Sequence, residues 1–233
     1  MNPKIVALVP MKGNSERVPN KNLKLFDGKP LYHAIINKLL KSTLIEEIII
    51  NTDSQRIIND IERNYFDKIK IRVRPNEIRG DFVSMNKIIK DDLENSDGDI
   101  YIQTHSTNPL LEIKSLDKSI NFMINSLKDQ NILFDSIFSV TKVQSRFYNI
   151  DGKPINHNRN ELLRTQDLPP IFEENSCFFI FTKDSFKNSG HKRIGIKSRM
   201  FEIDKIEAID IDTIEDFIIA ETIFKTRNKF WKQ

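Results

Sequence analysis

The chain has 233 residues, of which 39% are hydrophobic and 30% are charged, proportions typical of a folded domain with a charged surface. A net charge of +3 is too small to indicate a nucleic-acid-binding protein, and no apolar run approaches the roughly 18 residues of a membrane helix. The single cysteine, Cys177, excludes an internal disulfide and a cysteine-based zinc site. Because no signal-peptide pattern precedes Lys12, we expect a cytoplasmic protein that binds neither nucleic acid nor membrane.

Short apolar runs alternate with helical patterns through the first half of the chain. Runs typical of buried strands lie at residues 5–9, 47–51, 70–73, 99–103 and 136–140. Apolar residues recur at helical spacing between them, at 31–40, 54–65, 84–93 and 116–127. Strands separated by helices predict βαβ units and an α/β fold, with a mostly parallel sheet flanked by helices. Functional loops are then expected at the carboxyl ends of the strands.

The alternation stops after Lys142. Residues 144–175 are rich in Pro, Asn, Arg and Asp, and they include a hairpin-turn signal, Asp151-Gly152. The pair Pro169-Pro170 in the same segment is incompatible with a helix interior. We therefore expect one domain over residues 1–233, with an inserted excursion at about 143–175. The last predicted elements are strands at 176–182 and 200–203 and a helix at 213–224.

The loop after the first predicted strand is rich in cations and hydrogen-bond donors. Its polar residues include Lys12, Gly13, Ser15, Arg17, Lys21 and Asn22. A basic loop between a strand and a helix can present amides and positive charge to a phosphate, although such a loop can also be only a solvated turn. The motifs G-x-x-x-x-G-K-[ST] and G-x-G-x-x-G are both absent, which argues against a P-loop NTPase and a dinucleotide-binding site.

Two acidic residues in the segment IDIDTIED form a second candidate site. On a strand, Asp210 and Asp212 would face one side and offer two hard oxygen ligands to Mg²⁺. Asp212 could instead cap the last helix, with Glu215 completing a capping box. That alternative does not explain why Asp210 lies between two isoleucines. Asp53 follows the second strand and could likewise be a metal ligand or the N-cap of the next helix.

Three further polar segments could contribute to a site. Gln103 begins the segment QTHSTNP, in which His105 could act in acid–base chemistry or could only form hydrogen bonds. Arg79 precedes the helix at 84–93 and could bind a base or a ribose, or could belong to a charged turn. In the segment RTQDLPPIFEENS, Arg164 could bind a carboxylate or phosphate, or its charge could pair with a neighbour in a surface loop.

The order of these motifs resembles that of the CMP-sialic acid synthetases (acylneuraminate cytidylyltransferases) and of relatives that activate the eight-carbon sugar acid Kdo. The shared features are a strand followed by P-x-[RK]-G-x-S-x-R-x-P-x-K-N, then F-x-G-K-P-L, a strand ending in T-D, R-x-Q-D-L-P with E-x-N-[GS], and D-I-D-T-x-x-D-F. The resemblance runs from Ile5 to about Ala220. It implies a Rossmann-like nucleotidyltransferase fold and an enzyme that uses CTP, Mg²⁺ and an acidic sugar to form a CMP-sugar and pyrophosphate. It also implies a homodimer, formed through the excursion, in which the partner completes each site.

The resemblance assigns roles to residues at matching positions. The triphosphate would be held by Lys12, Ser15, Arg17, Lys21 and Asn22, and we add Gly13 and Arg79 to the nucleotide-binding set. Asp210 and Asp212 would hold the metal and, with Lys21 and Arg17, would form the catalytic group. The residues facing the sugar would be Gln103, Arg164 and Asn175, to which we add Gln166.

Two segments depart from the family pattern. Where the family has A-R-G-G-S-K, residues 11–16 read MKGNSE, so Lys12 lacks the guanidinium fork and Glu16 replaces a cation. Where the family has Q-P-T-S-P-L, the segment from Gln103 is longer by two residues and contains His105. The acceptor therefore need not be sialic acid. The alternatives are another NTP, an acceptor that is a sugar 1-phosphate or a phosphonate, and a non-catalytic binding protein, which would have no need of two metal carboxylates.

Overall fold

The computed structural model of the chain describes residues 3–128 and 133–230, and within these residues seven strands form one sheet in the order β5-β4-β1-β6-β8-β7-β9. The strands are β1 (Ile5–Leu8), β4 (Glu47–Thr52), β5 (Lys70–Val73), β6 (Ile100–Thr104), β7 (Ser136–Val143), β8 (Ile171–Phe181) and β9 (Ser198–Glu202). β8 runs antiparallel to β6 and β7, whereas the other neighbouring strands of this sheet pair in parallel. The predicted α/β fold with a mostly parallel sheet is confirmed.

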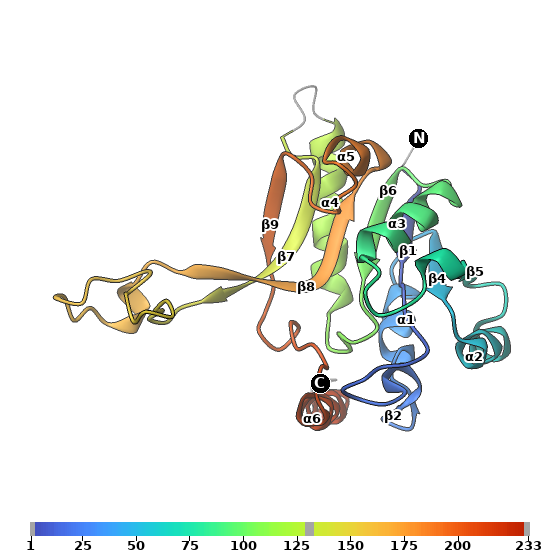
Figure 1. The fold of residues 1–233 in the computed structure, drawn as a ribbon, viewed down its shortest axis with the longest axis horizontal. Coiled ribbons are helices and arrows are strands. Elements are labelled where there is room, and N and C mark those ends of the chain that lie inside the picture. Colours follow the sequence, from blue (N-terminus) through green and yellow to red (C-terminus); the bar gives the residue numbers. More distant parts are fainter. Residues whose placement is uncertain (1–2, 129–132, 231–233) are drawn as a thin grey trace.

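Helices cover both faces of this sheet (Figure 1). They are α1 (His33–Leu39), α2 (Gln55–Tyr65), α3 (Met85–Glu94), α4 (Ile113–Lys128), α5 (Lys183–Asn188) and α6 (Ile214–Phe230), with short 3₁₀ turns η1 (Lys21–Leu23), η2 (Asn76–Ile78) and η3 (Thr165–Asp167). Ile5 and Ala7 of β1 belong to a buried cluster with α1, α2 and α4, whereas Val6 and Leu8 belong to one with α3 and α5. Because successive strand residues point to opposite faces, one short apolar run supplies both cores.

A third buried cluster closes the end of the sheet where the parallel strands finish. A small hairpin, β2 (Leu25–Phe26) and β3 (Lys29–Pro30), turns at Asp27-Gly28, where both residues have positive φ. Phe26 packs edge-on against Phe217 of α6, with ring centroids 5.5 Å apart. This contact places the last helix beside the first loops of the chain, as Figure 1 shows.

Between β7 and β8, a segment that we call the arm (residues 144–170) projects from the body of the molecule (Figure 1). The two strands stay paired as they leave the body, from Val140 opposite Glu174 to Val143 opposite Ile171. The predicted strand at 176–182 therefore begins five residues earlier, at Ile171, and extends into the proposed excursion. The predicted turn at Asp151-Gly152 is present, with Gly152 at a φ of +72°.

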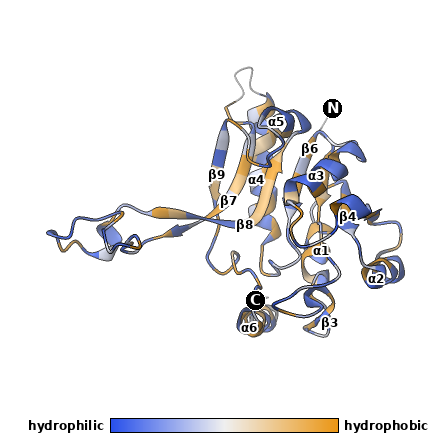
Figure 2. Cartoon of the chain, in the orientation of Figure 1, coloured by the Kyte–Doolittle hydropathy of each residue, from blue (hydrophilic) through white to orange (hydrophobic). Residues whose placement is uncertain are grey.

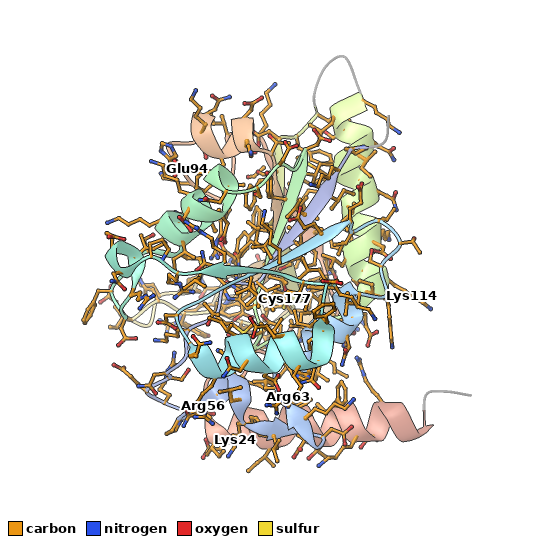
Figure 3. All side chains as sticks on the ribbon, turned by 90° about the vertical axis from the view of Figure 1, so that its right-hand side faces the viewer. Lys24, Arg56, Arg63, Glu94, Lys114 and Cys177 are labelled. Carbon is orange, nitrogen blue, oxygen red and sulfur yellow. The ribbon has the colours of Figure 1, made fainter. Side chains whose placement is uncertain are left out.

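The last part of the chain differs from the prediction in one respect. Residues 209–213 have no strand hydrogen bonds and form an extended connection to α6. Apolar residues concentrate in the central strands and polar residues on the outer helix faces (Figure 2). In the same way, Arg56, Arg63 and Lys114 lie on the outside, while Cys177 lies in the interior (Figure 3). Among the described residues, no helix has the length and apolar character needed to cross a membrane.

Candidate active site

The basic loop after β1 is held in place by its neighbours on β4 and α2. The backbone N–H groups of Val9 and Met11 donate to carbonyls of β4, so the loop begins as a continuation of the sheet. The N–H of Gly13 then donates to Asp53 Oδ1 at 2.8 Å. A Cβ on residue 13 would lie 2.8 Å from the Cβ of Ser54, so only glycine fits this close approach.

This arrangement gives Asp53 a different role from that of a helix cap. Ser54, not Asp53, caps α2, because its side chain accepts a hydrogen bond from the N–H of Ile57. Asp53 instead fixes the loop through Gly13. The prediction of a helix cap at Asp53 was therefore wrong by one residue.

Two cations of the loop meet the segment that precedes α6. Lys21 is almost fully buried, and its Nζ donates to the carbonyl of Ile211 at 2.5 Å and to Asp212 Oδ1 at 3.3 Å. Arg17 Nη1 lies 3.2 Å from Asp212 Oδ2. The structure thus brings two predicted catalytic residues, Arg17 and Lys21, together with a third, Asp212, that lies about 190 positions later in the chain.

The capping role proposed for Asp212 is also wrong. Thr213 and Asp216 cap α6 reciprocally, because the Asp216 N–H donates to Thr213 Oγ1 and the Asp216 carboxylate accepts from the N–H of Thr213. Ile211 is fully buried, whereas Asp210 and Asp212 on either side of it reach solvent. The two carboxylates are therefore presented together by an extended segment, without the strand that the sequence pattern predicted.

The surroundings of Asp210 disfavour its ionised form. Surrounding protein atoms that limit its hydration raise the pKa of Asp210, and the charge of Asp212 raises it further. A hydrogen bond from Thr107 and the charge of Lys21 act in the opposite direction. Two carboxylates that repel one another fit a divalent cation with oxygen ligands, because the cation would offset their negative charge. Within residues 3–128 and 133–230, no group of three or more His, Cys, Asp or Glu side chains is placed to hold a metal. The remaining ligands would therefore have to come from substrate and water.

A first hollow of about 250 Å³ opens beside the basic loop. Its lining includes Lys12, Ser15, Lys21, Asn22, Arg74, Gly80, Asp81, His105, Ser106 and Thr107. Asn22 braces the loop, since its Nδ2 donates to the Lys12 carbonyl and its Oδ1 accepts from Ser106. Lys12 forms an ion pair with Asp81 at 2.5 Å. We call this the nucleotide-side hollow.

Sequence reasoning missed Arg74 at this hollow. Arg74 is only 4% exposed, and it donates to Asn51 and to the carbonyl of Met11 in the basic loop. Burial lowers its pKa. Arg79, which the sequence suggested, does not line the hollow but donates to the Arg74 carbonyl. One feature of the sequence could have pointed to Arg74. The pair Arg74-Pro75 directly follows a predicted strand, at the carboxyl end where functional loops were expected.

A second hollow, of about 580 Å³, lies between the start of β8 and the segment before α6. It is lined by Thr141, Val143, Glu173, Glu174, Asn175, Ser176, Lys205, Ala208, Ile209 and Asp210. Asn175 Nδ2 donates to Thr141 Oγ1 at 2.9 Å. Ser176 has a φ of +56° where the pairing of β7 with β8 shifts register, so a bulge turns this part of the strand toward the hollow. We call this the acceptor-side hollow.

A contact between neighbouring residues links the two hollows. Thr107 lines the nucleotide-side hollow, and its carbonyl accepts from the N–H of Ile211 at 3.0 Å, directly beside Asp210, which lines the acceptor-side hollow. Gln103 is fully buried beside them, and its Nε2 lies 3.1 Å from Nε2 of His105. Burial and the nearby charge of Arg193 lower the pKa of His105 to about 4, so this imidazole is neutral at pH 7.

Two predicted sugar-binding residues lie elsewhere in the chain. Arg164 and Gln166 are in the arm, and neither belongs to the lining of the nucleotide-side or the acceptor-side hollow. The Arg164 side chain is 73% exposed and pairs with Asp167, with 2.7 Å between Nε and Oδ2. Their assignment to the sugar stays a prediction that requires the arm of a second molecule.

Comparison with known proteins agrees with this geometry. The profile of the cytidylyltransferase family matches residues 6–232. A pseudaminic acid cytidylyltransferase of Campylobacter jejuni is 25% identical, and the match covers 97% of this chain and 98% of that protein. An N-acylneuraminate cytidylyltransferase of Escherichia coli O18:K1:H7 is 27% identical over 98% of this chain and 54% of that protein.

Solved structures show the same fold. A CMP:2-keto-3-deoxy-manno-octonic acid synthetase complexed with CTP has a TM-score of 0.71 at 14% identity, covering 96% of this chain and 99% of that one. A 4-diphosphocytidyl-2C-methyl-D-erythritol synthase of Anaerococcus prevotii has a TM-score of 0.69 at 16% identity, covering 97% and 100%. The Rossmann-like nucleotidyltransferase fold and the predicted class of enzyme are confirmed. The chain belongs to the cytidylyltransferase family.

Proposed function

We propose that this enzyme transfers CMP from CTP to a hydroxyl of an acidic sugar, of the sialic, pseudaminic or related acid class, and releases pyrophosphate. The observation that carries the proposal is the link between the two hollows. The carbonyl of Thr107, on the nucleotide side, accepts a hydrogen bond from the N–H of Ile211, the neighbour of Asp210 on the acceptor side, so two substrates bound in these hollows would meet at that contact. The printed names of the two relatives, one of them matched over 98% of its own length, support the choice of substrates.

In the proposed reaction, the sugar hydroxyl attacks the α-phosphorus of CTP, and the bond from that phosphorus to the pyrophosphate oxygen breaks. Such a transfer requires mainly positioning and neutralisation of charge. Lys21 and Arg17 already converge on Asp212, so their positive charges lie at the boundary between the substrates. Lys12 and Ser15 line the nucleotide-side hollow and would hold phosphate oxygens there.

Asp210 and Asp212 would hold Mg²⁺. Their donor set suits that ion, as two hard carboxylates that leave several coordination positions for phosphate oxygens and water. When bound, the ion would supply neutralisation of phosphate charge and orientation of the two substrates. The protein contributes rigidity, because Ile211 between the carboxylates is buried and Lys21 holds its carbonyl.

We further propose a homodimer in which the arm contacts a second copy. Two apolar side chains of the arm are almost fully exposed, Ile150 at 101% and Leu162 at 94%. Exposed apolar residues on a projecting segment are typical of an association surface. A second copy would also provide an arginine, Arg164, that the acceptor-side hollow of one chain lacks.

The test is a pyrophosphate-release assay with the four NTPs, each against N-acetylneuraminate, pseudaminate and Kdo, with and without Mg²⁺. We expect release only with CTP, an acidic sugar and Mg²⁺ together, and a CMP-sugar as the second product. Release that requires a sugar 1-phosphate, or that is faster with another NTP, would replace the proposal with a nucleotidyltransferase that uses that acceptor or that NTP. Equal rates with and without added Mg²⁺, after chelation, would remove the metal from it.

A further inference from the structure

Arg193, in the connection between α5 and β9, is held much more tightly than a surface arginine. Its Cζ lies 3.6 Å from the ring centroid of Phe179, which is fully buried in β8. Its Nη1 donates to Oε1 of Gln103 in β6 at 2.7 Å. Only 22% of the side chain is exposed. Stacking on an aromatic ring together with a short hydrogen bond orients the guanidinium before any ligand arrives.

The position of Arg193 connects the two hollows. Its partner Gln103 contacts His105, which lines the nucleotide-side hollow. On the other side, Nη2 lies 4.0 Å from Oε1 of Glu174, which lines the acceptor-side hollow. A guanidinium between these neighbours stands beside the place where an acceptor must approach the nucleotide.

The charges around the acceptor-side hollow need such a cation. Three of its lining residues are acidic, Glu173, Glu174 and Asp210, and Lys205 is the basic residue of the lining. An anionic sugar would be repelled by this set. Arg164 of the same chain lies in the arm and pairs with Asp167. Within the protomer, Arg193 places a guanidinium at the edge of this hollow, 4.0 Å from Glu174.

The contacts of Arg193 leave capacity for a ligand. A guanidinium has five N–H donors, and a separation of 4.0 Å from Glu174 is too long for a hydrogen bond. Burial lowers the pKa of Arg193, because desolvation disfavours its charged form. A carboxylate that forms two parallel hydrogen bonds with the free edge would relieve this cost.

On these grounds we propose that Arg193 binds the carboxylate of the acceptor sugar and thereby selects acidic over neutral acceptors. This inference rests on the proposed function and adds to it a specificity-determining residue supplied by the same protomer. The competing explanation is that Arg193 only buttresses Gln103, in which case the charge of the acceptor would not matter to it.

The experiment compares N-acetylneuraminate with its neutral C1 carboxamide in the wild-type enzyme and in Arg193→Gln. We expect kcat/KM for the acid to fall about 10- to 100-fold in the variant, because a charge-assisted hydrogen bond is lost. The value of kcat/KM for the carboxamide should fall less than about threefold in the same variant. The Kd for CTP, measured by titration calorimetry, should not change. The matched control is Lys192→Gln, which removes the adjacent exposed charge and should behave as wild type.

Three outcomes separate the explanations. Equal losses with acid and carboxamide would overturn the inference and leave a structural role. If Arg164→Gln, and not Arg193→Gln, abolishes the discrimination, selection belongs to the arm and the inference fails. The proposed function itself would be refuted if the wild-type enzyme used none of the three sugar acids, which are N-acetylneuraminate, pseudaminate and Kdo. Arg193→Lys provides a second test if the glutamine variant unfolds, because it keeps the charge, loses the fork and should raise the acceptor KM with little change in kcat.

Discussion

Two regions of the molecule differ in how many of their side chains find partners within one chain. One is the end of the sheet at which the two hollows lie, and the other is the arm. Around the hollows, buried polar groups have internal partners, as Lys21 has with Ile211 and Asp212. In the arm, Ile150 and Leu162 lie in solvent, and Arg164 pairs with a close neighbour in sequence, Asp167. The first region is preorganised by its own fold, whereas the second has the composition of a surface that a partner would cover. The predictions below test that difference.

The largest effect is expected from the paired carboxylates. Asp210→Asn or Asp212→Asn should reduce kcat by at least about 1000-fold, because each removes charge from the proposed Mg²⁺ site. The fold should persist, because α6 is capped by Thr213 and Asp216 and not by these residues. Pyrophosphate release and circular dichroism provide the two measurements. Glu215→Gln, an exposed neighbour, is the control, and near-normal turnover in both aspartate variants would refute the metal assignment.

The arm should tolerate substitution without loss of the monomer fold but with loss of assembly. Ile150→Asp combined with Leu162→Asp should raise the dimer dissociation constant by about 100-fold or more. The reason is that charges would replace two apolar side chains that dimer formation would bury. Light scattering coupled to gel filtration over a concentration series gives the mass. Phe66→Asp, at a 75% exposed position on the body, is the control. An unchanged mass in the double variant would rule out the arm as the interface.

A mixing experiment sharpens the same comparison. Arg164→Gln and Asp210→Asn should each be nearly inactive alone if the partner completes each site. After subunit exchange, about half of the dimers are mixed and each has one intact site, so about a quarter of the wild-type activity should return. No recovery, with exchange verified by mass, would mean that Arg164 does not reach the partner's hollow.

A smaller effect is expected at the basic loop. Lys21→Ala should raise the Kd for CTP about 10- to 100-fold, because a charge-assisted contact to phosphate is lost. The acceptor KM should change less, since Lys21 lines only the nucleotide-side hollow. Titration calorimetry measures the Kd for CTP, and initial rates give the acceptor KM. Lys29→Ala, an exposed lysine of β3, is the control, and an unchanged CTP affinity in Lys21→Ala would exclude the loop from phosphate binding.

The smallest effect concerns the pH dependence of stability at His105. Its pKa is about 4 in the folded protein and about 6.5 in an unfolded chain, because burial and the charge of Arg193 disfavour the cation. Between these values the unfolded chain binds more protons, so the stability due to His105 is complete above pH 6.5 and falls as the pH decreases toward 4. At pH 5.5 the loss is roughly 1.4 kcal/mol.

The measurement is urea unfolding of the wild type and of His105→Gln at pH 8 and pH 5.5. From pH 8 to pH 5.5, the free energy of unfolding of the wild type should fall by about 1.4 kcal/mol more than that of the variant. Only this difference is diagnostic, because Asp92 is a buried acid whose pKa is raised to about 7 and acts with the opposite sign. Parallel pH profiles for the two proteins would contradict the assignment to His105.

Patterns that depend on near neighbours were readable from the chain. The apolar run of β1, the basic residues that follow it and the alternation of Asp210 with Asp212 each required only a few adjacent positions, and the second and third of these mark parts of the site. Where two local explanations competed, the chain alone did not decide between them. The cap of α2 is Ser54 and that of α6 is Thr213, each one residue away from the aspartate that was considered for the cap.

The tertiary structure decided which distant residues share a site. Closure of the chain by α6 against the β2–β3 hairpin brings Lys21 within 3.3 Å of Asp212, and no spacing in the sequence predicts that contact. Arg74 and Arg193 lie outside the motifs, and they became candidates only through burial and through their contacts with Asn51 and Gln103. Local propensity sets where strands, turns and caps begin, whereas the placement of buried cations depends on which elements pack together, and packing is a property of the whole chain.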